Sequence, residues 1–246
     1  MRTTLPTIAA AALLLAAAAL PAAAQEGPPP DEADDAGETW DEPEGSGLTW
    51  TAGVQTDYVR RGVSRTEDGS VFLGVDYEAG VFYAGAWASN VDVGQADAEG
   101  DFYVGVRPEI AGFGVDLSAT YVAYLGQGDG EDLNHWETQA QLSRSIGPVW
   151  AAASVGWSPD WIGAGEEAWW WRADAAYEVL PRWTLSAAVG GQDVSDSPEE
   201  YTYWNVGTTY ALTDRISTDV RWWDTDADDL GEPYEGRLVA GIKIAF

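Results

Sequence analysis

The sequence contains no cysteine, a single lysine (Lys243) and a single histidine (His135). The absence of cysteine excludes disulfide bonds and thiolate metal sites, although it does not fix the cellular compartment. Positive charge is also scarce, because 12 Lys and Arg stand against 41 Asp and Glu, a formal net charge of -29. Such an acidic chain repels the phosphates of nucleic acids, so we expect no nucleic-acid partner.

Beyond residue 24 the chain also lacks the roughly 18 consecutive apolar residues that a transmembrane helix needs. A mature chain that enters a membrane must therefore do so as a closed barrel. Residues 1–24 differ, because Arg2 precedes an apolar stretch over 8–20 and Ala22-Ala23-Ala24 supplies small residues for cleavage. They predict a secretory signal peptide, with the mature protein beginning near Gln25. The alternative is an uncleaved membrane helix, for which the apolar stretch is short.

Residues 25–47 form an acidic stretch that contains three consecutive prolines and almost no apolar side chains. Such a segment cannot bury a core, so we expect a disordered periplasmic extension.

From residue 48 to residue 246 polar and apolar residues alternate with the period of two that is typical of β-strands. In 113–125, for example, Leu117 and Tyr121 share an uncharged face, whereas Asp116 lies on the other. Each segment has about the length that a tilted membrane strand requires. Twelve such segments are expected, at 48–60, 69–79, 81–91, 100–110, 113–125, 134–146, 149–158, 167–179, 183–193, 201–211, 215–224 and 235–246.

A soluble β-sandwich would alternate in the same way, but three features favour an all-β, transmembrane, antiparallel up-and-down β-barrel of about 12 strands. The segments exceed the usual 5–6 residues, and many of the 14 Trp lie near segment ends, as in the aromatic girdles of outer-membrane barrels. Short connections, such as Ala79-Gly80, alternate with longer ones near 61–68, 92–99, 126–133, 159–166, 194–200 and 225–234. This pattern places both termini in the periplasm; ten or fourteen strands remain compatible with it.

Several local sequences resemble the TorF-type porin family of proteobacterial outer-membrane proteins. They are Thr56-Asp57-Tyr58-Val59-Arg60-Arg61-Gly62-Val63-Ser64, Ser89-Asn90-Val91-Asp92, Ser158-Pro159-Asp160-Trp161 and Trp204-Asn205-Val206-Gly207. The resemblance spans nearly all of 48–246 and implies an outer-membrane barrel, without an established solute and without catalytic residues. Phe246, with Ile244 and Ile242 alternating before it, is similar to the C-terminal signal that the barrel assembly machinery recognises.

Charged residues on the polar face of the segments are the candidate pore lining. We expect Arg107, Glu109, Asp116, Arg172, Asp174, Asp219 and Arg221 to set selectivity in a path for passive diffusion of small hydrophilic solutes. The alternative is a salt-bridged interior that fills a non-conducting structural or surface-binding barrel, since twelve strands fall between filled eight-stranded and open sixteen-stranded barrels.

Acidic residues dominate the longer connections and predict a negative mouth that prefers cations. The same acidity is compatible with bridging of lipopolysaccharide through divalent ions, and with a halophilic adaptation of the whole proteome. Within 225–234 and its flanks, Asp224, Asp226 and Asp228 have the spacing of a calcium loop, but Asp229 replaces the required Gly. We therefore expect no resident cofactor, with loop-bound Ca²⁺ or Mg²⁺ as the alternative.

An enzyme is not expected. A lipid-modifying barrel would need a Ser-His couple, and no serine has a spacing that pairs it with His135. No phosphate-binding loop or nucleophile elbow is present either.

Overall fold

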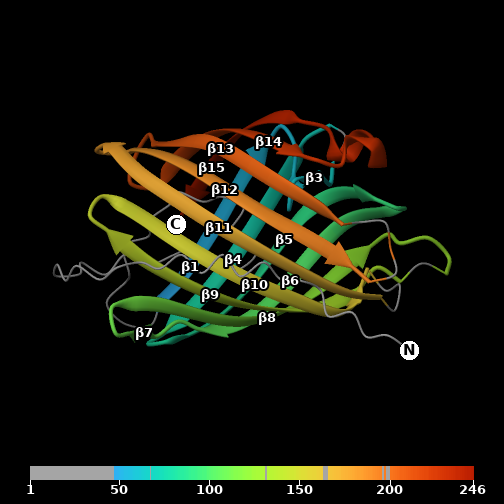
Figure 1. Ribbon diagram of the computed structural model, residues 1–246, viewed down its shortest axis with the longest axis horizontal. Helices are drawn as coiled ribbons and strands as arrows, with labels where there is room; N and C mark the ends of the chain where they lie inside the picture. The colour runs from blue at the N-terminus through green and yellow to red at the C-terminus, as the bar shows by residue number, and fades with distance from the viewer. Residues whose placement is uncertain (1–46, 67, 131, 163–165, 196, 198–199) are drawn as a thin grey trace.

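The computed structural model describes residues 47–246 except 67, 131, 163–165, 196 and 198–199. These residues form a closed antiparallel barrel (Figure 1). The predicted signal peptide and nearly all of the predicted acidic extension lie outside the described residues. The wall consists of twelve strands: β1 (Gly47–Gln55), β4 (Ser70–Ala79), β5 (Phe82–Val93), β6 (Ala96–Val106), β8 (Phe113–Leu125), β9 (His135–Ile146), β10 (Val149–Trp161), β11 (Glu166–Leu180), β12 (Trp183–Val194), β13 (Tyr201–Ala211), β14 (Ile216–Thr225) and β15 (Arg237–Ala245).

Each wall strand pairs with its neighbours along the chain, and the ring closes where β1 pairs with β15. The closure extends to the last residue, because the backbone N–H groups of Trp50 and Phe246 each donate to the carbonyl of the other at 2.9 Å. Closure satisfies the backbone groups at the edge strands, which an open sheet would leave unpaired. The fold class and the strand number predicted from the sequence are therefore confirmed.

One end of the barrel carries short turns and both ends of the ring-forming chain; we call it the short-turn end, and the opposite end the long-loop end. At the short-turn end, residues with positive φ angles, such as Gly80 (62°) and Arg182 (73°), make the tight connections. The long-loop end carries two 3-10 helices, η2 (Asp228–Leu230) and η3 (Glu232–Tyr234). No helix in the described part of the chain is long and apolar enough to cross a membrane.

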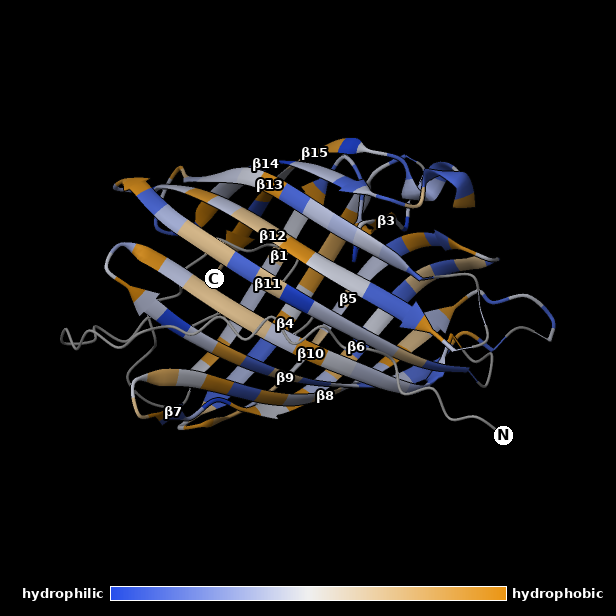
Figure 2. Cartoon of the chain, in the orientation of Figure 1, coloured by the Kyte–Doolittle hydropathy of each residue, from blue (hydrophilic) through white to orange (hydrophobic). Residues whose placement is uncertain are grey.

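Hydrophilic and hydrophobic residues alternate along the wall strands (Figure 2), and many large apolar side chains of the wall are exposed on its outward face. Leu73, Val104 and Val206, for example, are 49%, 58% and 57% exposed. The inward positions between them are buried, and most of them are polar, aromatic or small, which is the reverse of a soluble protein that keeps its large apolar residues inside.

Two predicted segments differ most from the structure. The expected first strand, 48–60, stops at Gln55, and residues 59–64 instead form a two-stranded hairpin, β2 (Val59–Arg60) and β3 (Val63–Ser64), apart from the wall sheet. The expected long loop at 92–99 is a two-residue turn between β5 and β6, whose pairing is irregular between Asn90 and Val93. This irregularity breaks the alternation, and so it concealed the continuation of the strands.

Candidate functional site: the barrel interior

Basic side chains gather inside the barrel although the chain as a whole is strongly acidic. Of the eleven basic residues that the structure describes, only Arg144, Arg182 and Arg215 lie outside the interior. The other eight are buried or half-buried within the ring: Arg60, Arg61, Arg65, Arg107, Arg172, Arg221, Arg237 and Lys243. Desolvated charges of this kind are tolerated when opposite charges and hydrogen bonds compensate them.

One group of charges lies near the short-turn end. Arg107 donates from Nε to Asp116 at 2.8 Å and approaches Glu78 at 3.5 Å. Tyr83 donates its hydroxyl to the other oxygen of Asp116 at 2.8 Å, and Arg107 lies 4.5 Å from the centre of its ring. Arg107 and Asp116, predicted from strand phase, are therefore brought together in one network.

A second group lies farther along the wall, on β11 and β14. Arg172 donates to Asp174 at 2.7 Å. Arg221 donates to Asp219 at 3.2 and 3.1 Å, and to Asn205 at 2.7 Å. Because each arginine pairs with a carboxylate two residues away on its own strand, the charges are neutralised locally.

Six of the seven predicted pore-lining residues therefore face the interior. The seventh, Glu109, lies in the two-residue strand β7 (Glu109–Ile110) and is exposed. The regular strand β6 ends at Val106, and Pro108, which lacks the N–H that a ladder needs, separates it from β7. The strand phase assumed for Glu109 consequently does not apply.

The interior of the long-loop end is occupied by a segment that we call the mouth hairpin, residues 57–66. Arg61 and Gly62 form its two-residue turn with φ angles of 50° and 82°, the geometry of a type I′ turn. A Cβ at Gly62 would lie 2.5 Å from Cβ of Tyr203, so the turn also needs the small residue for space.

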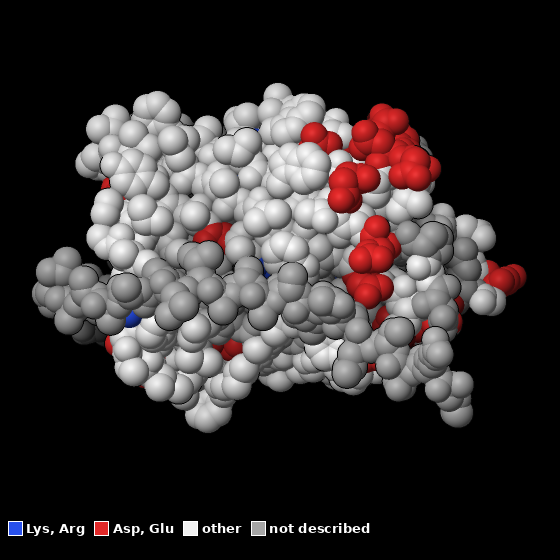
Figure 3. Space-filling view, viewed as in Figure 1, with Lys and Arg blue, Asp and Glu red and all other residues white. Residues whose placement is uncertain are grey.

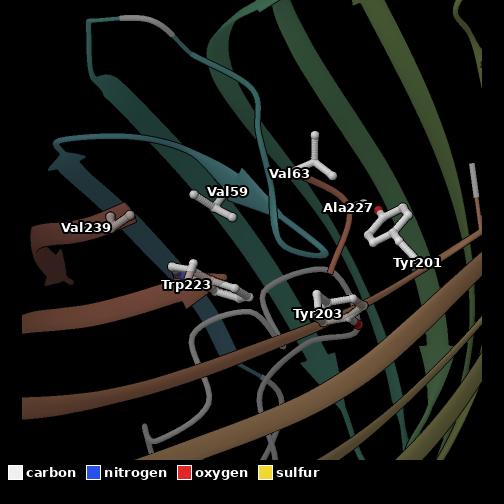
Figure 4. Close-up of a cluster of buried hydrophobic side chains, with 7 residues drawn as sticks. All are labelled: Val59, Val63, Tyr201, Tyr203, Trp223, Ala227 and Val239. Carbon is white, nitrogen blue, oxygen red and sulfur yellow. The ribbon is translucent and has the colours of Figure 1, made fainter. Parts of the chain in front are cut away.

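Apolar packing holds one side of the mouth hairpin (Figure 4). Val59 and Val63 share a buried cluster with five wall or loop residues: Tyr201, Tyr203, Trp223, Ala227 and Val239. At the base of the hairpin, Asp57 accepts hydrogen bonds from Ser64 at 2.8 Å and Thr66 at 2.9 Å, and Arg237 of β15 forms an ion pair with it at 2.8 Å.

Ion pairs hold the other side. Arg60 bridges Glu99 of β6 at 3.3 Å and Glu137 of β9 at 3.0 Å. Arg61 makes two hydrogen bonds to Glu137, from Nη2 at 2.7 Å and from Nη1 at 3.1 Å. The side chains of Arg60, Arg61, Glu99 and Glu137 are at most 8% exposed, so the hairpin is fastened to the wall in a largely dry environment.

Two tryptophans complete the surroundings of Arg61. Its guanidinium carbon lies 3.6 Å from the ring centre of Trp170 and 5.3 Å from that of Trp161. His135 contacts Trp161 and Glu137. Its ring centre lies 4.9 Å from that of Trp161, and its Nε2 atom lies 3.2 Å from Oε1 of Glu137. Its other ring nitrogen lies 2.8 Å from the carbonyl of Leu133, so both nitrogens of His135 are engaged and neither is placed to activate a serine.

Sequence reasoning missed the mouth hairpin. Its available signal was compositional: in a chain so poor in basic residues, Arg60, Arg61 and Arg65 lie within six positions of one another beside Gly62. Three of the four segments that carried the family resemblance meet here, since the hairpin spans the first and Asp92 of the second donates its backbone N–H to the carbonyl of Arg65 at 2.6 Å. Trp161, from the third, stacks on Arg61.

Acidic side chains gather at the long-loop end, on the right of Figure 3. The predicted cation ligands there serve separate contacts. Asp224 accepts the indole N–H of Trp222 at 3.4 Å, Asp226 accepts the backbone N–H of Thr202 at 2.7 Å, and Asp228 begins η2. Across the described residues no group of three or more potential ligands is arranged to hold a metal ion.

Comparisons with known proteins identify a family and several similar barrels. A family model described as "Bacterial protein of unknown function (Gcw_chp)" matches residues 41–238. No curated protein sequence matches the chain. Among solved structures, the KdgM porin superposes with a TM-score of 0.57 at 9% identity, covering 82% of this chain and 99% of that one. The NanC porin gives 0.56 at 9% identity, with 81% and 99% covered. At this identity the likeness establishes the barrel fold.

Proposed function

We propose that this chain, which belongs to the Gcw_chp family of bacterial proteins of unknown function, is an outer-membrane channel for passive diffusion of small hydrophilic solutes. The observation that carries the proposal is a closed twelve-stranded ring whose outside is apolar and whose inside is charged. A charged interior behind a lipid-compatible wall is the arrangement by which porins admit polar solutes. Similar solved barrels are porins, and the TorF-type resemblance agrees with this function.

The exterior supports residence in a bilayer. Outward-facing aromatic residues occur near both ends of the wall, with Trp50 and Trp183 at the short-turn end and Trp136, Trp169 and Trp222 toward the long-loop end. Outer-membrane barrels carry such girdles at the two interfaces. An outward Arg or Lys at the bilayer midplane would cost about 2–4 kcal/mol, and eight of the eleven described basic residues lie in the interior instead.

The remaining expectations follow from this location. We propose export through a signal peptide over 1–24, recognition of Phe246 by the barrel assembly machinery, and contact of the long loops with lipopolysaccharide. No catalytic group is assigned, because the one histidine is engaged by Leu133 and Glu137.

We propose that the channel prefers cationic solutes. The described interior carries nine carboxylates beside its eight basic groups: Asp57, Asp76, Glu78, Glu99, Asp101, Asp116, Glu137, Asp174 and Asp219. Because the interior is nearly balanced, the acidic long-loop end dominates the field at the entrance and concentrates cations. One similar barrel is described as the KdgM porin in complex with disordered oligogalacturonate, which is a polyanion; an acidic entrance opposes such a solute.

A specific observation favours a second function, a non-conducting structural or surface-binding barrel. The mouth hairpin fills part of the interior and the charges there are paired, as expected of a barrel that uses its interior only for stability.

Liposome swelling distinguishes the two functions. The folded barrel is reconstituted into liposomes, and swelling is followed in isosmotic solutions of a small neutral sugar, an organic ammonium salt and an organic carboxylate salt. The channel predicts swelling, fastest when the permeant ion is the cation. Swelling no faster than in protein-free liposomes, from protein shown to be folded by heat-modifiable migration, would support the structural barrel.

A further inference from the structure

The surroundings of Arg61 form a complete binding site for a guanidinium group. Glu137 accepts two hydrogen bonds from Arg61, at 2.7 and 3.1 Å, which gives the paired geometry that planar guanidinium groups prefer. Trp170 covers the guanidinium at 3.6 Å, and Trp161 lies on it at 5.3 Å. A carboxylate together with aromatic faces is the combination that recognises flat or quaternary organic cations.

All of the recognising groups belong to the wall, whereas the guanidinium belongs to the hairpin. Glu137 is on β9, Trp161 on β10 and Trp170 on β11, three consecutive strands in hydrogen-bonded order. The place of Trp170 is built into the wall, because its indole lies directly over Gly156, where any Cβ would collide with the ring. The site therefore does not depend on the hairpin for its construction.

The hairpin is not part of the wall sheet. It pairs only with itself among the sheets and joins the ring through the chain at each end, near Gln55 and Ser70. If it leaves, Glu137 keeps His135 at 3.2 Å but loses both arginines. A buried carboxylate that loses its cationic partners is strongly destabilised, so the emptied site favours another cation.

We propose that Glu137, Trp161 and Trp170 form a binding site for guanidinium-type organic cations, and that Arg61 occupies it as the protein's own ligand. An external cation of this class competes with Arg61, and its binding stabilises the state in which the hairpin is displaced from the mouth. The binding site stands on the geometry alone; the consequence for conduction rests on the proposed channel function.

Binding is tested first, without reference to conduction. Methylguanidinium is titrated by calorimetry into the folded, detergent-solubilised barrel, with sodium at equal ionic strength as the reference. R61Q should bind at least about tenfold more tightly than the wild type, because the competing group is gone. R61Q/E137Q should lose this binding. R61Q/W170L, which keeps Glu137, should weaken this binding, and it serves as a second test in case R61Q/E137Q fails to fold.

The matched control is R182Q, since Arg182 is an exposed arginine whose ion pair with Asp214 lies at the short-turn end. It should bind as the wild type does. Equal affinity of R61Q and the wild type, or an affinity of R61Q that neither second substitution lowers in folded protein, would overturn the site.

Conduction is then recorded in planar bilayers. Methylguanidinium should raise the open probability of the wild type and have no such effect on R61Q, which should already be open in sodium salt. Binding by R61Q without conduction in any variant would reject the channel and retain the site. If the protein conducts, methylguanidinium does not change its open probability and no binding is detected, the binding site is rejected and the channel function is retained.

Discussion

Arg61 and Glu137, which lie 76 positions apart in the sequence, form two hydrogen bonds inside the barrel, at 2.7 and 3.1 Å. Their contact attaches the mouth hairpin to the wall. The strand pattern of the sequence predicts the wall but not the hairpin. This contact is one of several that hold the mouth hairpin inside the barrel, together with the buried apolar cluster and the ion pairs of Arg60 and Arg237.

Glu137→Gln should destabilise the barrel by about 3–5 kcal/mol, because Arg60 and Arg61 would stay buried without their carboxylate. The free energy of unfolding is measured by urea denaturation in lipid vesicles. Glu178→Gln is the control, because Glu178 is exposed near the short-turn end, and it should change stability by less than about 0.5 kcal/mol. Equal effects of the two substitutions would show that the buried pairs do not fasten the hairpin.

Gly62→Ala should displace the mouth hairpin while the wall persists. A Cβ there meets Tyr203 at 2.5 Å, and the φ angle of 82° is unfavourable for any other residue type. Limited digestion with trypsin detects the displacement. Arg60, Arg61 and Arg65 are buried in the wild type and become cleavable once the hairpin leaves.

Gly80→Ala is the control for that experiment, since Gly80 also has a positive φ angle, 62°, but has open space around it. It should leave the protease pattern unchanged. Resistance of Gly62→Ala at all three arginines would contradict the described packing of the turn.

Arg172→Gln should raise cation preference. It removes a positive charge from the interior and leaves the carboxylate of Asp174 without the partner that lies 2.7 Å away. The reversal potential in a salt gradient should shift toward the cation limit, whereas Arg182→Gln at the exposed short-turn end should shift it little. An unchanged potential for Arg172→Gln would place β11 outside the conducting path.

Phe246→Ala should reduce the yield of assembled barrel in cells, as expected if the terminal side chain is recognised during assembly. The substitution keeps the backbone pair between residues 50 and 246, so the purified variant should refold into lipid with nearly normal stability. Normal assembly in cells, measured by heat-modifiable migration, would argue against recognition of the side chain.

The wall could be predicted from sequence because its signal is local. Residues such as Leu117 and Asp116 alternate within one strand, and lipid contact enforces that alternation over each strand. Strand phase likewise located Arg107, Asp116, Arg172 and Asp174 in the interior. Strand phase could not show which of these residues form ion pairs with one another. It gives the face of the strand on which a residue lies, and not the conformation of its side chain.

The mouth hairpin could not be predicted because its signal is not local. Residues 56–60 continue the alternating pattern of the first strand, and only the pairing partner shows where the strand ends: β4 begins at Ser70, opposite Gln55. The inward position of Arg60 depends on Glu99 and Glu137, which are 39 and 77 residues away. Contacts over such separations are fixed by the closure of the ring.

Single-channel recording of the folded mature protein, in planar bilayers across a salt gradient, tests directly whether the charged interior conducts ions. We expect discrete conductance steps with a cation-selective reversal potential, and longer openings when Arg61→Gln releases the mouth hairpin. The absence of steps from both the wild type and the Arg61→Gln protein, each shown to be folded and inserted, would contradict the proposed channel and leave a structural barrel.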